Sequence, residues 1–150
     1  LKNTPSCITC YGGRLWVATH TSFFDSEMYS YSYDKKEDKL TAVSNYNLPS
    51  KVQGVAFDDN GSIYLSTSYG RNNSSYLKVY SSLLSLDKKP NEPKVKVEMP
   101  PCSEEVAIAD GTVFVLFESA SAKYFEGTDG MGKSPAPIDK LLEVSVASIW

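Results

Sequence analysis

Residues 61–68 read GSIYLSTS and form the middle copy of a pattern that decides the fold. Residues 13–20 (GRLWVATH) and residues 111–118 (GTVFVLFE) repeat it, since in each copy a turn glycine precedes a strand-like run with an aromatic residue at the same position. The three glycines lie 48 and 50 residues apart, which is close to the length of a four-stranded propeller blade, roughly 40 to 50 residues. The spacing therefore predicts a repeat of small antiparallel sheets.

Each copy contains further strand-like segments. The three runs are preceded by segments ending in YGG, DDNG and ADG, whose glycine, asparagine and aspartate tolerate the positive φ of tight hairpin turns. Alternating side-chain character predicts third strands at residues 27–34, 76–81 and 141–146 and fourth strands at residues 40–46 and 94–99. The third copy has no segment left for a fourth strand.

The sequence therefore predicts an all-β fold: a β-propeller of about three four-stranded antiparallel blades, half of a six-bladed ring, with the last blade lacking its outer strand. Residues 1–150 are expected to form one partial propeller domain, with blades at about residues 5–49, 50–100 and 101–150. Period-two patterning disfavours a helical fold, and a β-sandwich remains the alternative. Three blades leave two exposed ends, so a missing N-terminal half or a second copy is expected to complete the ring. The start, Leu1-Lys2-Asn3 without methionine, indicates a boundary or processing site.

Composition narrows the function classes. The chain is 41% hydrophobic and 22% charged, as in folded domains. Its 15 basic and 18 acidic residues give a net charge of −3, so no basic footprint for nucleic acid is present. No apolar run approaches the roughly 18 residues of a membrane span. The Cys7-x-x-Cys10 pair lacks the second ligand pair of a zinc site, and with Cys102 it makes an odd number, so packed or free thiols are expected.

Four segments carry a resemblance to a known group of proteins: GRLWVATH (13–20), QGVAFDDNGSIYLSTS (53–68), GTVFVLFESASAKY (111–124) and PIDKLLEVSV (137–146). They resemble the final blades of secreted bacterial six-bladed propeller proteins whose activity is not established. The resemblance covers nearly the whole chain and implies a secreted or periplasmic location. The broader group, which includes gluconolactonase-like and NHL-repeat proteins, contains both metal-dependent hydrolases and binding proteins, so the fold alone does not assign a function.

Strand direction predicts where a site would lie. Because strands alternate in a blade, the loops entering the first strand and those joining the second and third strands are expected at one end of the ring. The third such connection is longer by about fifteen residues, over residues 124–135. Long loops are commonly lids or binding loops, and a glycine-rich excursion without a role is the alternative. The ligand-binding candidates on this face are His20, Gln53, Arg71, Glu105, Glu118 and Lys123.

Two functions fit these candidates. The first is a non-catalytic scaffold without a cofactor that binds a small molecule or a protein, in which Arg71 grips a carboxylate or phosphate or else decorates a turn. The second is a metal-dependent hydrolase or lactonase in which Glu105 and Gln53 help hold a divalent ion, such as calcium, in the central channel. His20 is the only histidine, and no G-x-S-x-G motif accompanies it, so a capped or surface role is favoured for it. For Glu118 and Lys123, the alternative to a ligand-binding role is a surface ion pair.

Overall fold

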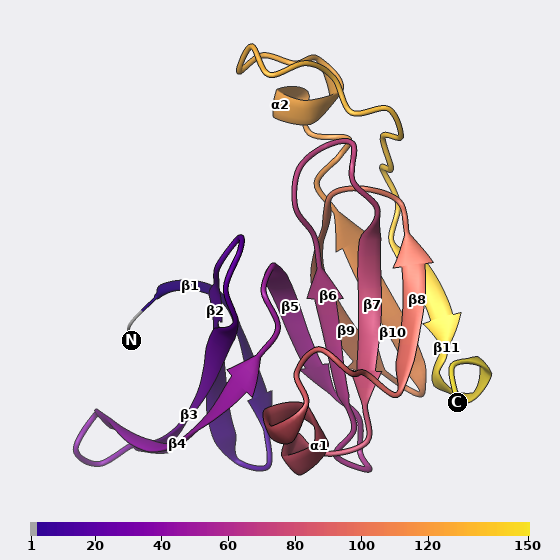
Figure 1. Ribbon diagram of the computed structural model, residues 1–150. Helices are drawn as coiled ribbons and strands as arrows, with labels where there is room; N and C mark the ends of the chain where they lie inside the picture. Colours follow the sequence, from indigo (N-terminus) through magenta and orange to yellow (C-terminus); the bar gives the residue numbers. More distant parts are fainter. Residues whose placement is uncertain (1–2) are drawn as a thin grey trace.

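The structure is a computed structural model that describes residues 3–150. The expected boundary at Leu1 and Lys2 lies outside these residues. Three antiparallel sheets make up the protein, and in each sheet neighbouring strands are consecutive in the chain (Figure 1). The predicted all-β class is confirmed, as are the four-stranded first and second copies and the three-stranded third copy.

The strand bounds follow the predicted segments to within two residues. The first sheet contains β1 (Thr4–Tyr11), β2 (Arg14–His20), β3 (Ser26–Asp34) and β4 (Lys39–Leu48). The second contains β5 (Val52–Phe57), β6 (Ile63–Thr67), β7 (Ser75–Tyr80) and β8 (Val95–Met99). The third contains β9 (Ser103–Ala109), β10 (Thr112–Phe117) and β11 (Leu142–Ser145). Short helical segments are α1 (Leu83–Lys88), α2 (Ala122–Phe125) and the 3-10 turn η1 (Val146–Ser148).

Two hairpin turns explain why the predicted turn residues stand where they do. Gly12 and Gly13 have φ of 57° and 70° between β1 and β2, and Asp110 and Gly111 have φ of 49° and 70° between β9 and β10. A two-residue connection with positive φ at both positions has a twist that matches that of the flanking strands. Glycine and aspartate adopt this conformation at low cost, so these residues fix the register of both hairpins.

The second sheet lies between the other two, and its side chains alternate between two separate hydrophobic cores. Ile63 and Leu65 of β6 pack toward the first sheet with Trp16, whereas Tyr64 packs toward the third sheet with Val113. This is the strand alternation expected of a sheet covered on both faces. The first strands of the sheets also meet, since β5 contacts both β1 and β9.

The outer faces of the first and third sheets carry apolar side chains. Ile8, Val17 and Tyr29 are register partners across β1, β2 and β3, on the side opposite the core residue Ala18. Ile8 is 60% exposed, and Leu116 on β10 is 49% exposed. Scattered exposed apolar residues are ordinary on a protein surface, but a contiguous row across three strands marks a face suited to contact with another element.

Helix α1 was not predicted from the sequence. Its six residues are too few for a helical repeat to emerge from the chain. A capping box defines its start, because the hydroxyl of Ser82 accepts from the Ser85 amide at 3.1 Å and the Ser85 hydroxyl accepts from the Ser82 amide at 3.1 Å. Leu86 is fully buried in the core between the first two sheets, so packing rather than helix propensity holds α1 in place.

Asp58 organises the turn between β5 and β6. Its side chain is buried, and its Oδ1 atom accepts from the amides of Asn60 at 2.9 Å and Ser62 at 2.8 Å. The Tyr64 hydroxyl lies 3.3 Å from the other carboxylate oxygen, and the Trp150 indole donates to that hydroxyl at 3.0 Å. One carboxylate therefore connects the turn of the second sheet with Trp150, which follows the third sheet.

The cysteines and the helices give no further information about which class of protein this is. Cys7, Cys10 and Cys102 are free thiols, as expected from their odd number. Burial raises the pKa of Cys7 to about 12, and the nearby Glu105 carboxylate adds to the effect, so the Cys7 thiol stays protonated at neutral pH. Within residues 3–150, every helix is too short or too polar to cross a lipid bilayer.

Candidate ligand-binding site

The loops that were predicted to share one end of the sheets do so. We call this the upper end, after its place in Figure 1; it comprises the connections at residues 21–25, 49–51, 68–74, 100–102 and 118–141. Backbone hydrogen bonds tie them together: the Lys51 amide donates to Thr21 at 2.7 Å, the Ser68 amide to Lys51 at 2.9 Å, and the Glu118 amide to Cys102 at 3.0 Å. These bonds join the first three connections to one another and the last two to each other, and Arg71 links the two groups through the carbonyl of Lys123.

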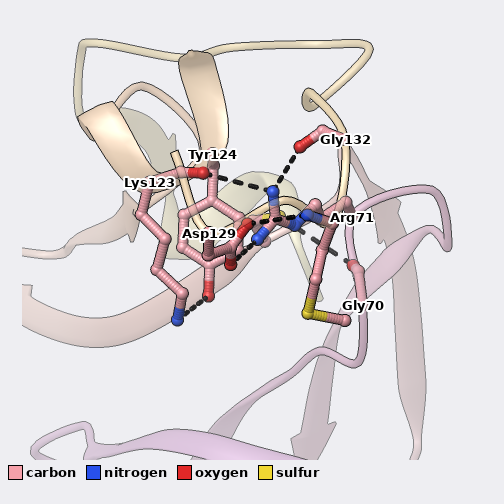
Figure 2. Close-up of polar contacts among 8 residues, drawn as sticks. Gly70, Arg71, Lys123, Tyr124, Asp129 and Gly132 are labelled. Carbon is pink, nitrogen blue, oxygen red and sulfur yellow. Dashed lines mark hydrogen bonds and ion pairs between the residues drawn. The ribbon is translucent and has the colours of Figure 1, made fainter. Parts of the chain in front are cut away.

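Arg71 anchors the long third connection to the second sheet. Its guanidinium donates to the carbonyl of Lys123 at 3.1 Å, to the carbonyl of Gly132 and to the carboxylate of Asp129 (Figure 2). Its charge also lies over the Tyr124 ring, 4.5 Å from the ring centre. Arg71 is 9% exposed, so these contacts use up the planar fork that a ligand carboxylate or phosphate would need. The carboxylate that Arg71 grips belongs to the protein itself.

We expect Arg71→Lys to loosen the connection without unfolding the sheets. Lysine keeps the positive charge but lacks the fork that reaches two carbonyls and a carboxylate together. Trypsin should then cleave after Lys123 or Lys133 several times faster than in the native protein, with fragments identified by mass spectrometry. Arg14→Lys on β2, an exposed position, is the matched control. Equal cleavage rates in the two variants would show that Arg71 does not hold this connection.

A pocket of about 460 Å³ opens between the loop at residues 68–74 and the anchored connection. Such a volume suits a small organic ligand. Asn72 and Asn73 are exposed and offer amide donors and acceptors, and Met131 is 77% exposed and offers an adaptable apolar contact. The lining consists of Gly70, Arg71, Asn72, Asn73, Lys123, Tyr124, Asp129 and Met131.

Two carboxyl groups, those of Glu104 and Glu118, lie where the long third connection leaves β10. The pKa of Glu104 is raised to about 8, chiefly by burial and then by a hydrogen bond and like-charge repulsion from Glu118, with Lys123 opposing the shift. The register pairs Phe117 with Ser103, which brings residues 104 and 118 to the same end of the sheet. Burial also raises the pKa of Tyr124, and its hydrogen bond with Glu118 acts in the same direction. Glu104 therefore keeps its proton at neutral pH.

This carboxyl pair should make the protein less stable as the pH rises. Because the folded protein keeps a proton on Glu104 up to about pH 8 whereas the ordinary value is 4.5, the folded state binds more protons than the unfolded chain in that window. Stability then falls as the pH increases through it. In urea unfolding, Glu104→Gln should have the same free energy of unfolding as the native protein near pH 4.5 and a higher one above about pH 8.

Exposed Glu143 on β11 supplies the matched control, because Glu143→Gln removes an equal charge on another strand of the same sheet. It should leave the slope of stability against pH unchanged. If Glu104→Gln also leaves that slope unchanged, the proton on Glu104 does not contribute to folding stability.

The remaining sequence candidates, His20, Gln53 and Glu105, lie along residues 52–54 at the start of β5. The His20 ring lies 3.2 Å, through Nδ1, from the carbonyl of Val52, which is a structural contact between the first two sheets. Glu105 accepts from the Val106 amide at 2.9 Å through Oε1 and packs against Gly54, where an added Cβ would lie 2.6 Å from that same oxygen. Burial raises its pKa. Gln53 is half-buried at the irregular register of β5.

A second pocket marks where the first strands of the three sheets meet. It has a volume of about 280 Å³ and is lined by residues 8–10 of β1, 55–57 of β5 and 105–108 of β9. Glu105 is the acidic residue in this lining, and Gln53 does not belong to it. Among residues 3–150, no group of three or more histidine, cysteine, aspartate or glutamate side chains is arranged to hold a metal ion.

Sequence reasoning named Arg71, Glu118 and Lys123, which the structure brings to one place, but it missed their partners. Asp129 and Gly132 belong to the long connection, and its unusual length was the available signal. Glu104 precedes Glu105 on β9, and because residues adjacent on a strand point to opposite sides, it lies with Glu118 and not in the pocket that Glu105 lines. Comparison with family models gives no match for this chain, and no curated protein matches it.

Proposed function

We propose that the three sheets are consecutive blades of a β-propeller and that the protein is a non-catalytic scaffold that binds a small polar molecule or a peptide at its upper end. The observation that carries the function is the pocket of about 460 Å³ between two loops that Arg71 holds together. A site whose walls are already fixed loses less conformational entropy on binding than a mobile one.

The chemistry of the pocket supports binding rather than turnover. Amides from Asn72 and Asn73, the ammonium group of Lys123 and the side chain of Met131 supply recognition contacts. His20, the side chain best suited to general base catalysis, is engaged with a backbone carbonyl in another part of the upper end. The ligand class that fits is a compact molecule with carbonyl or hydroxyl groups and an apolar edge.

The propeller arrangement is supported by the way the sheets pack. Each sheet meets the next face to face, and the first strands gather around the pocket of about 280 Å³. The row of Ile8, Val17 and Tyr29 on one outer face, and Leu116 on the other, would be covered by further blades. An N-terminal part or a second copy of the chain would supply them.

Native mass spectrometry tests the arrangement, and Val17→Lys provides the variant. We expect the 150-residue chain to associate through its outer faces and the lysine variant to lose that association, because a charge would be buried in the contact. A monomer whose outer faces bind no apolar dye would contradict the proposal.

Ligand screening by NMR tests the function. Compounds from a polar fragment library should shift amide signals of residues 70–73 and 123–131, and Asn72→Ala should weaken that response. Asn91→Ala, an exposed asparagine after α1, is the control. A compound that is chemically converted in the pocket would overturn the non-catalytic assignment, and so would a library in which nothing binds there.

A further inference from the structure

A separate basic pocket lies on the face of the second sheet that looks toward the first sheet. It has a volume of about 180 Å³ and takes three lysines from different elements: Lys51 from the loop before β5, Lys78 from β7 and Lys96 from β8. Tyr80 lies on the same face of β7, two residues from Lys78, and belongs to the core between the first two sheets. The lining consists of Ser50, Lys51, Thr67, Ser68, Tyr69, Asn73, Ser74, Tyr76, Lys78 and Lys96.

The three ammonium groups repel one another. Lys78 and Lys96 are direct partners in the register of β7 and β8, a placement that destabilises a sheet when the charges are alike. Burial lowers the pKa of Lys78, and the charges of Lys96 and Lys51 lower it further, with Asp25 acting in the opposite direction. Among residues 3–150, none of the three lysines forms an ion pair with a carboxylate.

Two carboxylates, those of Asp25 and Glu98, border this pocket. Asp25 accepts from the Asn91 amide at 3.1 Å, and Glu98 accepts from the Ser74 hydroxyl at 2.5 Å. Neither belongs to the lining of the pocket. Three ammonium groups therefore stand against two bordering carboxylates, and the net positive charge that remains is left for a bound anion to balance.

Aromatic rings hold two of the three lysines in position. The Lys96 ammonium lies 3.9 Å from the centre of the Tyr76 ring, and the Lys51 ammonium lies 5.2 Å from the centre of the Tyr69 ring. Such cation–π contacts restrict the flexible side chains. Ser68 accepts from the Ser75 hydroxyl at 3.0 Å, which leaves the proton of Ser68 to be donated to an anion.

The backbone at Lys51 is an independent observation. Lys51 has φ of 68°, a left-handed conformation that is unfavourable for a non-glycine residue. Hydrogen bonds from its amide to Thr21 at 2.7 Å and from Ser68 to its carbonyl at 2.9 Å hold it there. Strained residues fixed by their surroundings cluster at ligand sites, and here the strain places an ammonium group at the pocket.

From this arrangement we infer that the pocket binds a small multivalent oxyanion, either free phosphate or sulfate or the same group at the end of a larger ester. Three positive charges and a hydroxyl donor match the charge and the hydrogen-bonding capacity of such a group. The site shares Asn73 with the pocket at Arg71 but otherwise uses different residues, so it does not depend on the function proposed above.

The test is a titration of the protein with inorganic phosphate, followed by amide NMR and by thermal unfolding, with chloride keeping the ionic strength constant. We expect saturable shifts of residues 67–78 and 96 and a rise of the unfolding midpoint. Lys78→Met removes the charge but keeps the length of the side chain, and it should weaken phosphate binding by about tenfold or more. Glycerol phosphate in a parallel titration distinguishes an ester from free phosphate by which of the two binds more tightly.

Lys88→Met is the matched control, because Lys88 is exposed in the last turn of α1 and the variant has the same net charge. A response that rises linearly with phosphate and does not saturate would mean that phosphate only screens charge in general. An equal loss of phosphate binding in Lys78→Met and Lys88→Met would mean the same, and either result would overturn the proposed site. Without phosphate, Lys78→Met should be more stable than the native protein at low salt, since the repulsion is gone. A less stable Lys78→Met in that measurement would contradict the repulsion on which the inference rests.

Discussion

Replacement of Leu86 by alanine is expected to lower the free energy of unfolding by about 3 kcal/mol, within the range for buried leucines. Leu86 is 0% exposed and belongs to the core that joins the first two sheets. Helix α1 contacts both β4 and β7, so the lost methyl groups leave a cavity at a place where rigid strands prevent collapse. A helix of six residues has little stability of its own, and α1 should fray as well.

Leu84→Ala is the control for this prediction, since it makes the same chemical change in the same helix at a residue that is 61% exposed. It should change stability by less than about 0.5 kcal/mol. Urea unfolding followed by circular dichroism measures both variants. Equal losses would mean that Leu86 does not carry the attachment of the helix to the core.

Asp58→Ala should destabilise the protein by a similar amount, roughly 2 to 3 kcal/mol, because hydrogen bonds to a charged acceptor are among the stronger ones. The variant leaves the buried amide of Ser62 without its acceptor at Asp58 and removes the acceptor of the Tyr64 hydroxyl proton. The contact that Trp150 makes through Tyr64 should weaken too. Urea unfolding with tryptophan fluorescence reports both effects.

The neighbouring residue provides the comparison. Asp59 is exposed in the same turn, and Asp59→Ala should alter stability by less than about 0.5 kcal/mol. Asp58→Asn should lie between the two, since an amide oxygen still accepts from the turn amides but without the charge. An Asp59→Ala variant as unstable as Asp58→Ala would show that the loss comes from turn propensity and not from the buried contacts.

Much of the fold was readable from the sequence because the strands obey local rules. The turn glycines at 13, 61 and 111 and the alternation that follows them predicted β2, β6 and β10 and their partners. The lengths of strands and turns are set by contacts between residues that are only a few positions apart in the chain. A repeated sequence pattern is therefore enough to predict them. The missed helix α1 shows the limit: it depends on the burial of Leu86 against strands from two sheets, a long-range condition that six residues do not display.

The residues of the candidate site were predictable from the sequence, but the contacts between them were not. Arg71 was recognised as a residue that grips carboxylates, yet its partner Asp129 lies 58 residues away in the chain. The carboxyl pair of Glu104 and Glu118 depends on the register of β9 with β10, and the basic pocket depends on Lys78 standing opposite Lys96. Each of these is decided by strand pairing and loop path, which charge patterns along the sequence do not reveal.

The strand order within the sheets has a consequence for how the chain folds. Every sheet is a meander of consecutive strands, so each can form by closing short loops in succession, which carries a smaller entropic cost than pairing distant segments. The second sheet contributes to both cores, whereas the first and third each contribute to one. Energetically the molecule then resembles a short linear chain of units, in which stability is a sum of terms for single sheets and for neighbouring interfaces. A perturbation in the third sheet reaches the first chiefly through the second, and the middle sheet sets the cooperativity of the whole.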